Sequence, residues 1–359
     1  MILPRLLTPA LSLLLLVLPV QAAQEFLLPA PADSQRQLVI YSATDYRHLQ
    51  PLLQHFQKDH PQLSIRLVDL NTRELHDRFL TEGPDSPADL LISSAMDLQL
   101  KLVNDGHARP YRSSHTLALP SQAHWRHELF AFTFEPVLTV FNRTLIGPHP
   151  VPRSRQELLT LLRQDPARFA GRITTYDIAG SGVGYLLASQ DSQQGLMYGR
   201  LLEAFGSLAV HLDDTSNGML ESLAQGRMAI GYNLLGSYVS SALARYPQLE
   251  ALAPEDYTLM LMRLALIPTT APHPAAAGEL IDFMLSARGQ ALLAQNGLHP
   301  LLEPDSGQLR LAVQAQGPIT LIPLTPALLP LQDRFARKHF IDTWTHSITA
   351  APSATPDPE

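Results

Sequence analysis

The chain has 359 residues, a formal net charge of −7 and no cysteine. This length exceeds what one ordinary hydrophobic core accommodates, so we expect two lobes. The absence of cysteine excludes a disulfide framework and thiolate catalysis. The acidic balance, without a long basic block, argues against nucleic acid as a partner.

Residues 1–22 have the pattern of a secretory signal peptide. Arg5 comes first, an apolar run extends from Ala10 to Val20, and small residues follow up to Ala22. The apolar run is about 11 residues long, whereas a helix that crosses a bilayer needs about 20. We expect cleavage after Ala22 and export to the periplasm, with an uncleaved membrane anchor as the alternative.

The first half of the remaining chain alternates strands and helices. Residues 23–36 are rich in proline, alanine and polar residues and predict a short leader. Apolar, β-branched runs predict strands at 37–44, 63–70 and 88–95, and helical spacing of apolar residues predicts helices at 45–61, 72–83 and 96–107. Three strand-then-helix units in succession indicate a parallel sheet covered by helices.

Two long apolar strands, at 129–145 and 256–268, separate this region from a second α/β run. Within that run we expect helices at 153–166, 182–191 and 216–226 and strands at 171–177 and 227–236. A helix pair at 273–297, broken at Gly289, and an amphipathic helix at 331–348 complete the chain. We see no internal repeats.

This order predicts an α/β fold of two lobes, with two mixed sheets, flanking helices and a strand hinge. We place residues 37–137 and 260–348 in lobe 1, residues 138–259 in lobe 2, and a disordered tail at 349–359. In open α/β sheets, ligands bind outside the carboxyl ends of the strands. Two such sheets facing each other would form an interlobe cleft that closes about the hinge.

Several segments, taken in order, resemble the solute-binding proteins of ABC importers. The segments are "LVIYSAT", "ADLLISSAMDLQLKLVNDG", "FTFEPVLTVFNRTL", "GRITTYDIAGSGVGYLL", "GYNLLGSY" and "DYTLMLMRLALIP". The resemblance is to the ferric-iron-type branch, which has the type II periplasmic-binding fold. It implies a binding protein without catalysis or cofactor that delivers a small-molecule ligand to a permease in the inner membrane; we expect a monomer.

The ligand that the resemblance implies is an anion rather than ferric iron. Iron-binding members carry two adjacent tyrosines near the segment "GYNLLGSY", whereas Tyr232 and Tyr238 here are six positions apart. Relatives without the tyrosine pair bind phosphorylated sugars, phosphoglycerate or phosphonates. We therefore expect a small phosphorylated or carboxylated anion, with ferric iron as the alternative.

The stretch "YDIAGSGVGYLL" is a candidate anion-binding turn in lobe 2. It joins a strand to a helix, and its glycines would let backbone N–H groups at the helix start approach a ligand. Ser181 and Gly182 are the candidate contacts. The spacing is not that of a dinucleotide-binding or P-loop motif, and a plain strand-to-helix turn is the alternative.

Polar residues also follow two strands of lobe 1. Ser42, Thr44 and Asp45 end the strand at 37–44, and Ser93 and Ser94 end the strand at 88–95. Each group precedes a helix, so these side chains are candidates for ligand contact. Capping of the helix is the alternative, and both roles use the same exposed amides.

Two charged residues stand alone in the long apolar strands. Glu135 and Arg263 each need a partner or access to water, and Arg263 could pair with a carboxylate or phosphate. We treat both as candidate ligand contacts; the alternatives are that they are surface residues of the crossing strands or that they pair with each other. Tyr232 and Asn233 follow a lobe 2 strand and are also candidates, with core packing as the alternative.

Enzyme motifs are missing from the sequence, since G-x-S-x-G, H-E-x-x-H and S-x-x-K do not occur. We therefore predict no catalytic residue and no metal site. Two other functions remain open: signalling to a sensor kinase instead of feeding a permease, and an exported hydrolase that uses Asp45 or Glu135.

Overall fold

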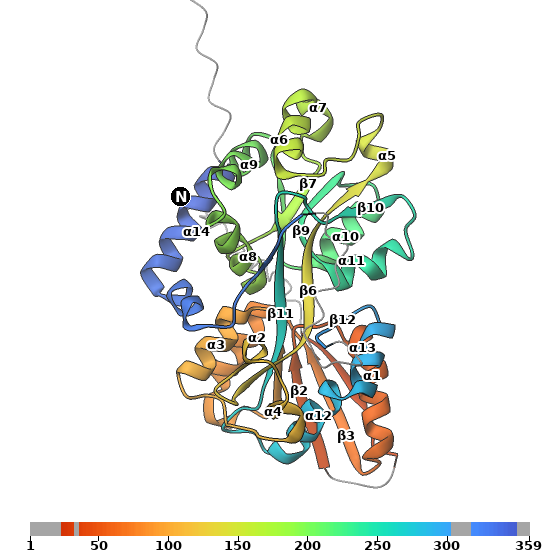
Figure 1. Cartoon of the computed structure of the whole chain (residues 1–359), viewed down its shortest axis with the longest axis vertical. Coiled ribbons are helices and arrows are strands. Elements are labelled where there is room, and N and C mark those ends of the chain that lie inside the picture. The colour runs from red at the N-terminus through yellow and green to blue at the C-terminus, as the bar shows by residue number, and fades with distance from the viewer. Residues whose placement is uncertain (1–22, 32–35, 303–316, 350–359) are drawn as a thin grey trace, which may run out of the picture.

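The computed structural model describes residues 23–31, 36–302 and 317–349, which form two lobes connected by long strands (Figure 1). The strands pair in the order β1-β3-β2-β4-β11-β6-β9-β7-β8. Lobe 1 contains β1 (Gln24–Leu28), β2 (Arg36–Ser42), α1 (Tyr46–Asp59), β3 (Leu63–Asp69), α2 (Thr72–Glu82), β4 (Leu90–Ser93), α3 (Met96–Asn104), α4 (Ser114–Leu117), β5 (His124–Trp125), α12 (Pro274–Leu285), α13 (Ala287–Gln295), β12 (His299–Pro300) and β13 (Ile319–Leu321). Lobe 2 contains α5 (Arg143–Ile146), α6 (Arg155–Gln164), α7 (Pro166–Phe169), β7 (Ile173–Tyr176), α8 (Gly182–Ser192), α9 (Leu196–Ser207), β8 (His211–Asp213), α10 (Ser216–Ala224), β9 (Ile230–Leu235), α11 (Gly236–Leu243) and β10 (Leu249–Leu252).

The hinge consists of β6 (Leu129–Asn142) and β11 (Thr258–Leu266), which run side by side between the lobes in Figure 1. They pair antiparallel, from Met260 opposite Pro136 to Ala265 opposite Phe130. The first part of β6 pairs with lobe 1 strands and its second part pairs with β9 and β10 of lobe 2. Every residue of β11 is buried, which explains its almost continuous apolar sequence.

Parallel pairing aligns the strand ends within each lobe. β2 pairs parallel with β3 and β4, and β7 pairs parallel with β8 and β9. The carboxyl ends of parallel strands lie at one edge of a sheet. Residues that follow these strands in both lobes therefore meet in the space between the lobes.

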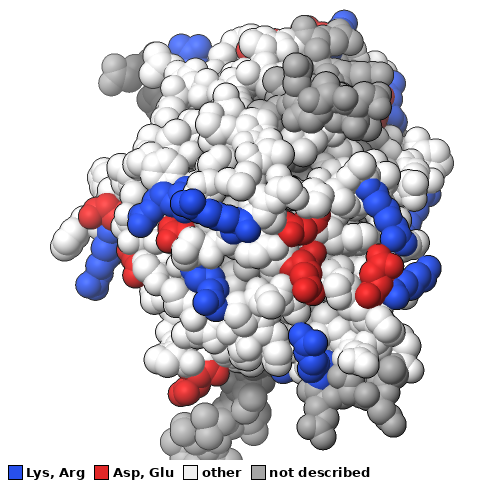
Figure 2. Space-filling view, turned by 60° about the horizontal axis from the view of Figure 1, so that its bottom comes forward, with Lys and Arg blue, Asp and Glu red and all other residues white. Residues whose placement is uncertain are grey.

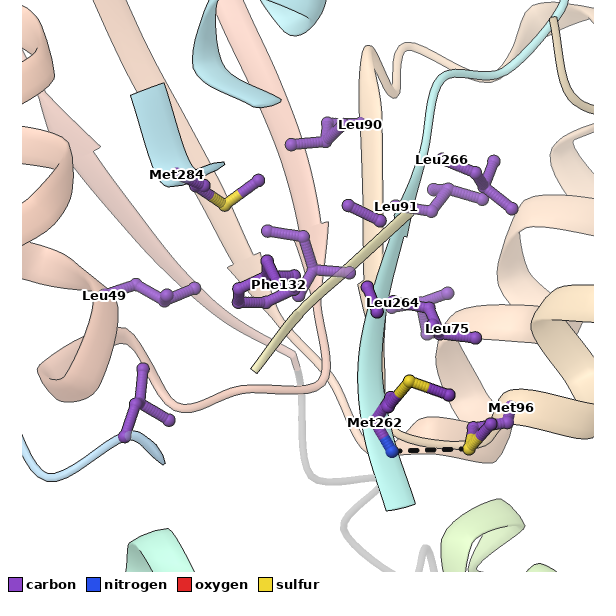
Figure 3. Packing of buried hydrophobic residues seen from close by; sticks show 14 of the residues in the cluster. Leu49, Leu75, Leu90, Leu91, Met96, Phe132, Met262, Leu264, Leu266 and Met284 are labelled. Atoms are coloured by element: carbon purple, nitrogen blue, oxygen red, sulfur yellow. Dashed lines mark hydrogen bonds between the residues drawn. The ribbon is translucent and has the colours of Figure 1, made fainter. Parts of the chain in front are cut away.

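The lobe 1 core is formed by side chains from both faces of the sheet (Figure 3). Leu49 of α1 and Met284 of α12 lie on one side of the strands, and Leu75 of α2 and Met96 of α3 lie on the other. The backbone N–H of Met262 in β11 donates to the Met96 sulfur at 3.3 Å. This contact ties α3 to the hinge strand.

The predicted α/β fold is confirmed, with differences at particular elements. Residues 24–28 form the edge strand β1, paired antiparallel with β3, rather than a leader. The break in the helix pair is at Ser286 rather than Gly289, because the Ser286 side chain caps α13 by accepting from the Gly289 N–H at 3.1 Å. Helix α9, strand β8 and strand β10 are additional to the predicted elements.

The predicted signal peptide, and all of the predicted tail except Thr349, lie outside the described residues. Within residues 23–31, 36–302 and 317–349, none of the helices has the length and apolar character needed to cross a membrane.

The carboxyl-terminal segment connects the two lobes a third time. The 3₁₀-helix η3 (Pro326–Gln332) packs on α3 of lobe 1, and α14 (Arg334–Thr349) packs on α9 of lobe 2. The Trp344 indole N–H donates to the Tyr198 hydroxyl at 3.0 Å, and Trp344 belongs to the lobe 2 core. We therefore assign 334–349 to lobe 2, in contrast to the predicted assignment to lobe 1, because its apolar face is buried there.

We expect Trp344→Ala to lower the free energy of unfolding by about 3–5 kcal/mol, because it removes a fully packed side chain and leaves a cavity. Urea unfolding followed by circular dichroism measures this change. Thr345→Ala, at an exposed position on the same helix, serves as the control and should change it by less than about 0.5 kcal/mol. Equal effects of the two substitutions would show that α14 does not contribute to the lobe 2 core.

Candidate functional site

A cavity of about 980 Å³ lies between the lobes. Its walls come mainly from residues at or just after the ends of β2, β3, β4, β7, β8 and β9, and from the helices that follow. The described lining residues are Ala23, Gln24, Ala43, Asp45, Asp69, Leu70, Asn71, Thr72, Glu74, Ser94, Tyr176, Asp177, Val183, Leu212, Asp213, Asp214, Thr215, Ser216, Asn217, Leu235 and Tyr238. The cavity is the interlobe site that the order of elements predicts.

The cavity is strongly acidic. Lobe 1 contributes three carboxylates, and lobe 2 contributes three more, whereas the described lining residues include no lysine or arginine. The carboxylates are Asp45, Asp69, Glu74, Asp177, Asp213 and Asp214. A site with this charge favours a cation over an anion.

Charges elsewhere are balanced locally. On the face shown in Figure 2, basic and acidic side chains are interspersed. Arg66 pairs with Glu25 at 2.8 Å, and Arg78 pairs with Glu82 at 2.8 Å. In the cavity, Arg47 at the rim lies 3.4 Å from Asp45, whereas no described ion pair involves Asp69, Glu74, Asp177, Asp213 or Asp214. The excess of acidic groups there is therefore a local property of the site, beyond the net charge of the chain.

Burial and neighbouring negative charges raise the pKa of two cavity carboxylates. Burial raises the pKa of Asp69 to about 7, and the nearby charge of Asp45 adds to this effect, against a hydrogen bond from the Tyr46 N–H. Burial also raises the pKa of Asp214, together with the charges of Asp177 and Asp213. Both shifts mean that the closed cavity disfavours more negative charge.

Helix starts surround the cavity, but side chains already cap three of them. Asn71 accepts from two N–H groups of α2, at 2.9 and 2.8 Å. Thr215 accepts from the Gly218 N–H of α10 at 3.0 Å. Ser181 accepts from the Gly184 N–H of α8 at 3.2 Å. These amides satisfy their hydrogen bonds within the protein, which reduces what they offer to an anion.

The two lobes are in direct contact around the cavity. The Tyr238 hydroxyl of α11 donates to the Asp45 carboxylate across the hinge at 2.8 Å. The Val183 N–H of α8 donates to the Thr72 hydroxyl of α2 at 3.0 Å. At the rim, Arg47 of α1 donates to the side chain of Asn217 in α10. The structure therefore represents a closed arrangement of the lobes.

Glycine at position 182 permits this close approach. A Cβ there would lie 2.7 Å from Leu98 Cδ1, 3.2 Å from Thr72 Oγ1 and 3.3 Å from Ala95 Cβ, all in lobe 1. The glycine-rich turn thus brings α8 against the other lobe, and Ser181 caps the helix.

A buried ion pair lies beneath the cavity in the hinge. Arg263 Nε donates to Glu135 at 2.8 Å, and both side chains are fully buried. The same guanidinium donates to the Thr44 hydroxyl at 2.6 Å and to the Ser237 hydroxyl at 3.0 Å. Burial opposes the charge of Glu135, but Arg263, His299 and hydrogen bonds outweigh it and hold the Glu135 pKa below its usual range. The pair joins both hinge strands to the loop after β2 in lobe 1 and to the first turn of α11 in lobe 2.

A second buried network lies within lobe 2. Arg155 donates to the Tyr232 hydroxyl at 2.8 Å and to Asp191 at 3.3 Å. Tyr232 donates to Asp191 at 3.0 Å, and Asn233, whose φ of 65° lies in the left-handed region, donates to Asp191 at 2.7 Å. The hydrogen bonds of Tyr232 and Asn233 therefore go to protein groups away from the cavity.

The predicted ligand-binding residues fall into five places. Asp45 and Ser94 line the cavity. Ser42 and Ser93 bond to the backbone N–H groups of Thr44 and Ala95 at their strand ends, while Thr44, Glu135 and Arg263 form the hinge network. Ser181 and Gly182 lie where the lobes touch, and Tyr232 and Asn233 lie in the lobe 2 network. Ligand contact stays a prediction for all of these residues, including Asp45 and Ser94 in the cavity lining.

Three cavity carboxylates that the sequence analysis missed occupy the same kind of position as Asp45. Asp69 ends β3, Asp177 follows β7, and Asp213 ends β8. An acidic residue at the carboxyl end of a predicted strand is the signal that could have found Asp69 and Asp177. Strand β8 has only three residues, which is too short for periodicity to reveal.

Comparisons with known proteins agree with this architecture. Residues 85–310 match the family model of bacterial extracellular solute-binding proteins. The substrate-binding protein of an ABC transporter from Agrobacterium tumefaciens is 32% identical, with a TM-score of 0.86, over 91% of this chain and 99% of that chain. The chain therefore belongs to the bacterial extracellular solute-binding proteins, the class that serves ABC transporters.

More distant structures share the fold. Iron-bound HitA from Pseudomonas aeruginosa is 16% identical, with a TM-score of 0.67, over 87% of this chain and 99% of that chain. AfuA from Actinobacillus pleuropneumoniae, with fructose-6-phosphate bound, is 18% identical, with a TM-score of 0.71, over 89% of this chain and all of that chain. A search of curated proteins finds no match. The resemblance to this family and the two-lobed periplasmic-binding fold are confirmed.

We expect Gly182→Val to hold the lobes apart, because the new side chain would overlap Leu98 and Thr72 of lobe 1. Small-angle X-ray scattering should show a larger radius of gyration than that of the wild-type protein. Gly199→Val is the matched control, since a Cβ at position 199 meets no atom within 4 Å among those described. An unchanged radius for Gly182→Val, with the wild type closed, would contradict the close contact.

We expect Asp69→Asn to stabilise the protein at pH 8. The native carboxyl titrates near 7 instead of 3.8, so the native state binds more protons in this window and wild-type stability falls as pH rises through it. The variant should be more stable by about 1–3 kcal/mol at pH 8, and the difference should vanish below about pH 4. Urea unfolding across pH tests this, with Asp85→Asn, an exposed carboxylate away from the cavity, as the control. A variant less stable than the wild type at pH 8 would refute the raised pKa.

Proposed function

We propose that this protein captures a small, positively charged solute in the interlobe cavity and delivers it to an inner-membrane ABC permease. The observation that carries the proposal is the set of six cavity carboxylates without a lysine or arginine among the described lining residues. The family supports an extracellular solute-binding component of an ABC transporter. Location in the periplasm, a monomeric state and the absence of catalysis form part of the proposal.

A cation explains how binding would drive closure. Carboxylates accept hydrogen bonds and, when ionised, donate none, so they match ammonium and hydroxyl groups. Two unit charges 4 Å apart interact by about 4 kcal/mol at an effective dielectric constant of about 20. Without a cation, closing the cleft brings the lobe 1 and lobe 2 carboxylates together. A cation removes this repulsion and therefore binds the closed form better than the open form.

We propose direct ligand contacts for Asp45 and Ser94, which the sequence predicted, and for Asp69, Asp177 and Asp213. The remaining predicted residues would act indirectly. Ser42, Thr44, Ser93, Glu135 and Arg263 would hold the lobe 1 loops and the hinge; Ser181 and Gly182 would form the interlobe contact; and Tyr232 and Asn233 would stabilise lobe 2.

A phosphorylated or carboxylated anion is the second candidate ligand. The starts of α1, α2, α3, α8 and α10 lie at the cavity and provide partial positive charge. AfuA, which shares the fold, has fructose-6-phosphate bound. At about half a unit charge per helix, these starts supply less charge than six carboxylates, and three are already capped.

Ferric iron has less support. The described residues contain no group of three or more His, Cys, Asp or Glu side chains arranged to hold a metal. Tyr232 is buried in the Arg155 network, and only Tyr238 of the two tyrosines lines the cavity.

A thermal-shift screen tests the proposal. The panel would contain primary amines, guanidines, amino alcohols, sugar phosphates, phosphonates, dicarboxylates and ferric citrate. A ligand at about 100 times its dissociation constant adds about 2.7 kcal/mol of stability, which raises the melting temperature measurably. We expect shifts with cations that are lost in Asp177→Asn and kept in Asp85→Asn. Shifts confined to sugar phosphates or dicarboxylates would overturn the cation proposal in favour of the anion.

A further inference from the structure

We propose that the ligand carries two separated positive charges, one held by each lobe, as in a linear diamine or a longer polyamine. This inference rests on the proposed function and deepens it, because it specifies the shape and charge of the cation.

The carboxylates are divided equally between the lobes. Lobe 1 holds one group around Asp45 and Asp69, of which Asp45 also lies 3.4 Å from Arg47 at the rim, and lobe 2 holds the other around Asp177 and Asp213. Each group lies at the carboxyl ends of parallel strands, on its own side of the hinge. The cavity therefore has two acidic walls rather than one acidic centre.

The carboxylates are held in place and keep an oxygen for a ligand. Asp69 Oδ2 accepts from the Tyr46 N–H at 2.9 Å, Asp177 Oδ1 accepts from the Ala179 N–H at 2.9 Å, and Asp213 Oδ1 accepts from the Thr215 N–H at 2.8 Å. No described residue donates a hydrogen bond to the other oxygen of these three carboxylates. Each wall therefore has a fixed acceptor for an ammonium group.

Ser94 offers a hydroxyl group to the cavity. Only 1% of this residue is exposed, it lines the cavity, and its hydroxyl has no hydrogen-bond partner among the described residues. The Ser94 hydroxyl is not among the buried side-chain groups that lack a partner, so it is open to the cavity and can bond there to water or to a ligand.

Apolar side chains also line the cavity. Besides the two acidic groups, the lining includes Leu70, Val183, Leu212 and Leu235, together with Tyr176 and Tyr238. Such side chains would pack against methylene groups, and the Tyr176 ring favours a nearby cation. The Tyr238 ring already has the Arg263 guanidinium 5.3 Å from its centre. A hydrated metal ion or a compact polyol would leave these apolar groups without a complement. An alkyl chain with a charged group at each end matches both features.

Two charges would also couple binding to closure. A monocation offsets the charge of the carboxylates in one lobe only. The carboxylates of the other lobe then keep their charge without a partner when the cleft closes. A dication bridges the walls, so its affinity depends on both lobes being in place, and it gains most from the closed form.

Isothermal titration calorimetry with the full secreted chain tests this inference. The probes are 1,4-diaminobutane, the triamine spermidine and, as the matched monocation, 1-aminobutane. We expect at least one of the two polycations to bind at least 10-fold more tightly than 1-aminobutane. Removing one charge from either wall, by Asp45→Asn or Asp177→Asn, should reduce this advantage at least 5-fold, whereas Asp85→Asn should not. The melting temperature of each ligand-free variant confirms that it is folded, and Ser94→Ala, which keeps every charge, should weaken binding of the polycation.

The outcomes separate this inference from the proposed function. Equal affinity for the monoamine and the polycations would overturn the two-charge inference and leave the cation proposal intact. Binding of sugar phosphates without binding of any amine would overturn both. Failure of both polycations to bind overturns this inference, whatever other ligand is found.

Discussion

The buried pair of Arg263 and Glu135 is the interaction on which the arrangement of the lobes depends. Both charges are fully buried in the hinge strands, and the guanidinium also binds Thr44 of lobe 1 and Ser237 of lobe 2. Removing one partner would leave the other charged and unpaired in the interior, which typically costs about 3–5 kcal/mol. The pair therefore ties the loops on either side of the cleft to the strands about which the lobes move.

The acidic character of the cleft follows from where the strands of the two lobes end. Because the strands of each lobe end at the hinge side, the residues after them converge on one cavity, and most of the charged ones are acidic. The closed contacts, from Tyr238 to Asp45 and from Val183 to Thr72, bring these acidic walls together. A positively charged solute resolves the resulting repulsion, which connects the charge of the site to the movement expected of a solute-binding protein.

Sequence analysis located the site better than it identified the residues in it. Asp45 and Ser94 line the cavity because they follow strands, and position along the chain reveals that. Arg263 attracted attention as a lone charge in an apolar strand, but its partner Glu135 is 128 positions away. The sequence left open whether these side chains contact a ligand, lie at the surface or pair with each other. Strand pairing brings the two together, since Arg263 lies opposite Thr133 and Glu135 opposite Leu261, which makes the two side chains diagonal neighbours on one face of the sheet. The expectation of a small anion came from the missing tyrosine pair and from glycines and serines at predicted helix starts, and it stays a prediction. The sequence does not show which carboxylates lie near those helix starts in the fold.

The sequence by itself determined the α/β class, the two lobes, the two crossing strands and the family, because periodicity, turn residues and the order of segments are local properties of the chain. Tertiary structure alone decided that α14 packs on lobe 2, that Gly182 is an interlobe contact, and that six carboxylates surround one cavity. These features depend on distances between residues far apart in the chain. Charge at a site is a sum over neighbours in space, and only the folded chain defines those neighbours.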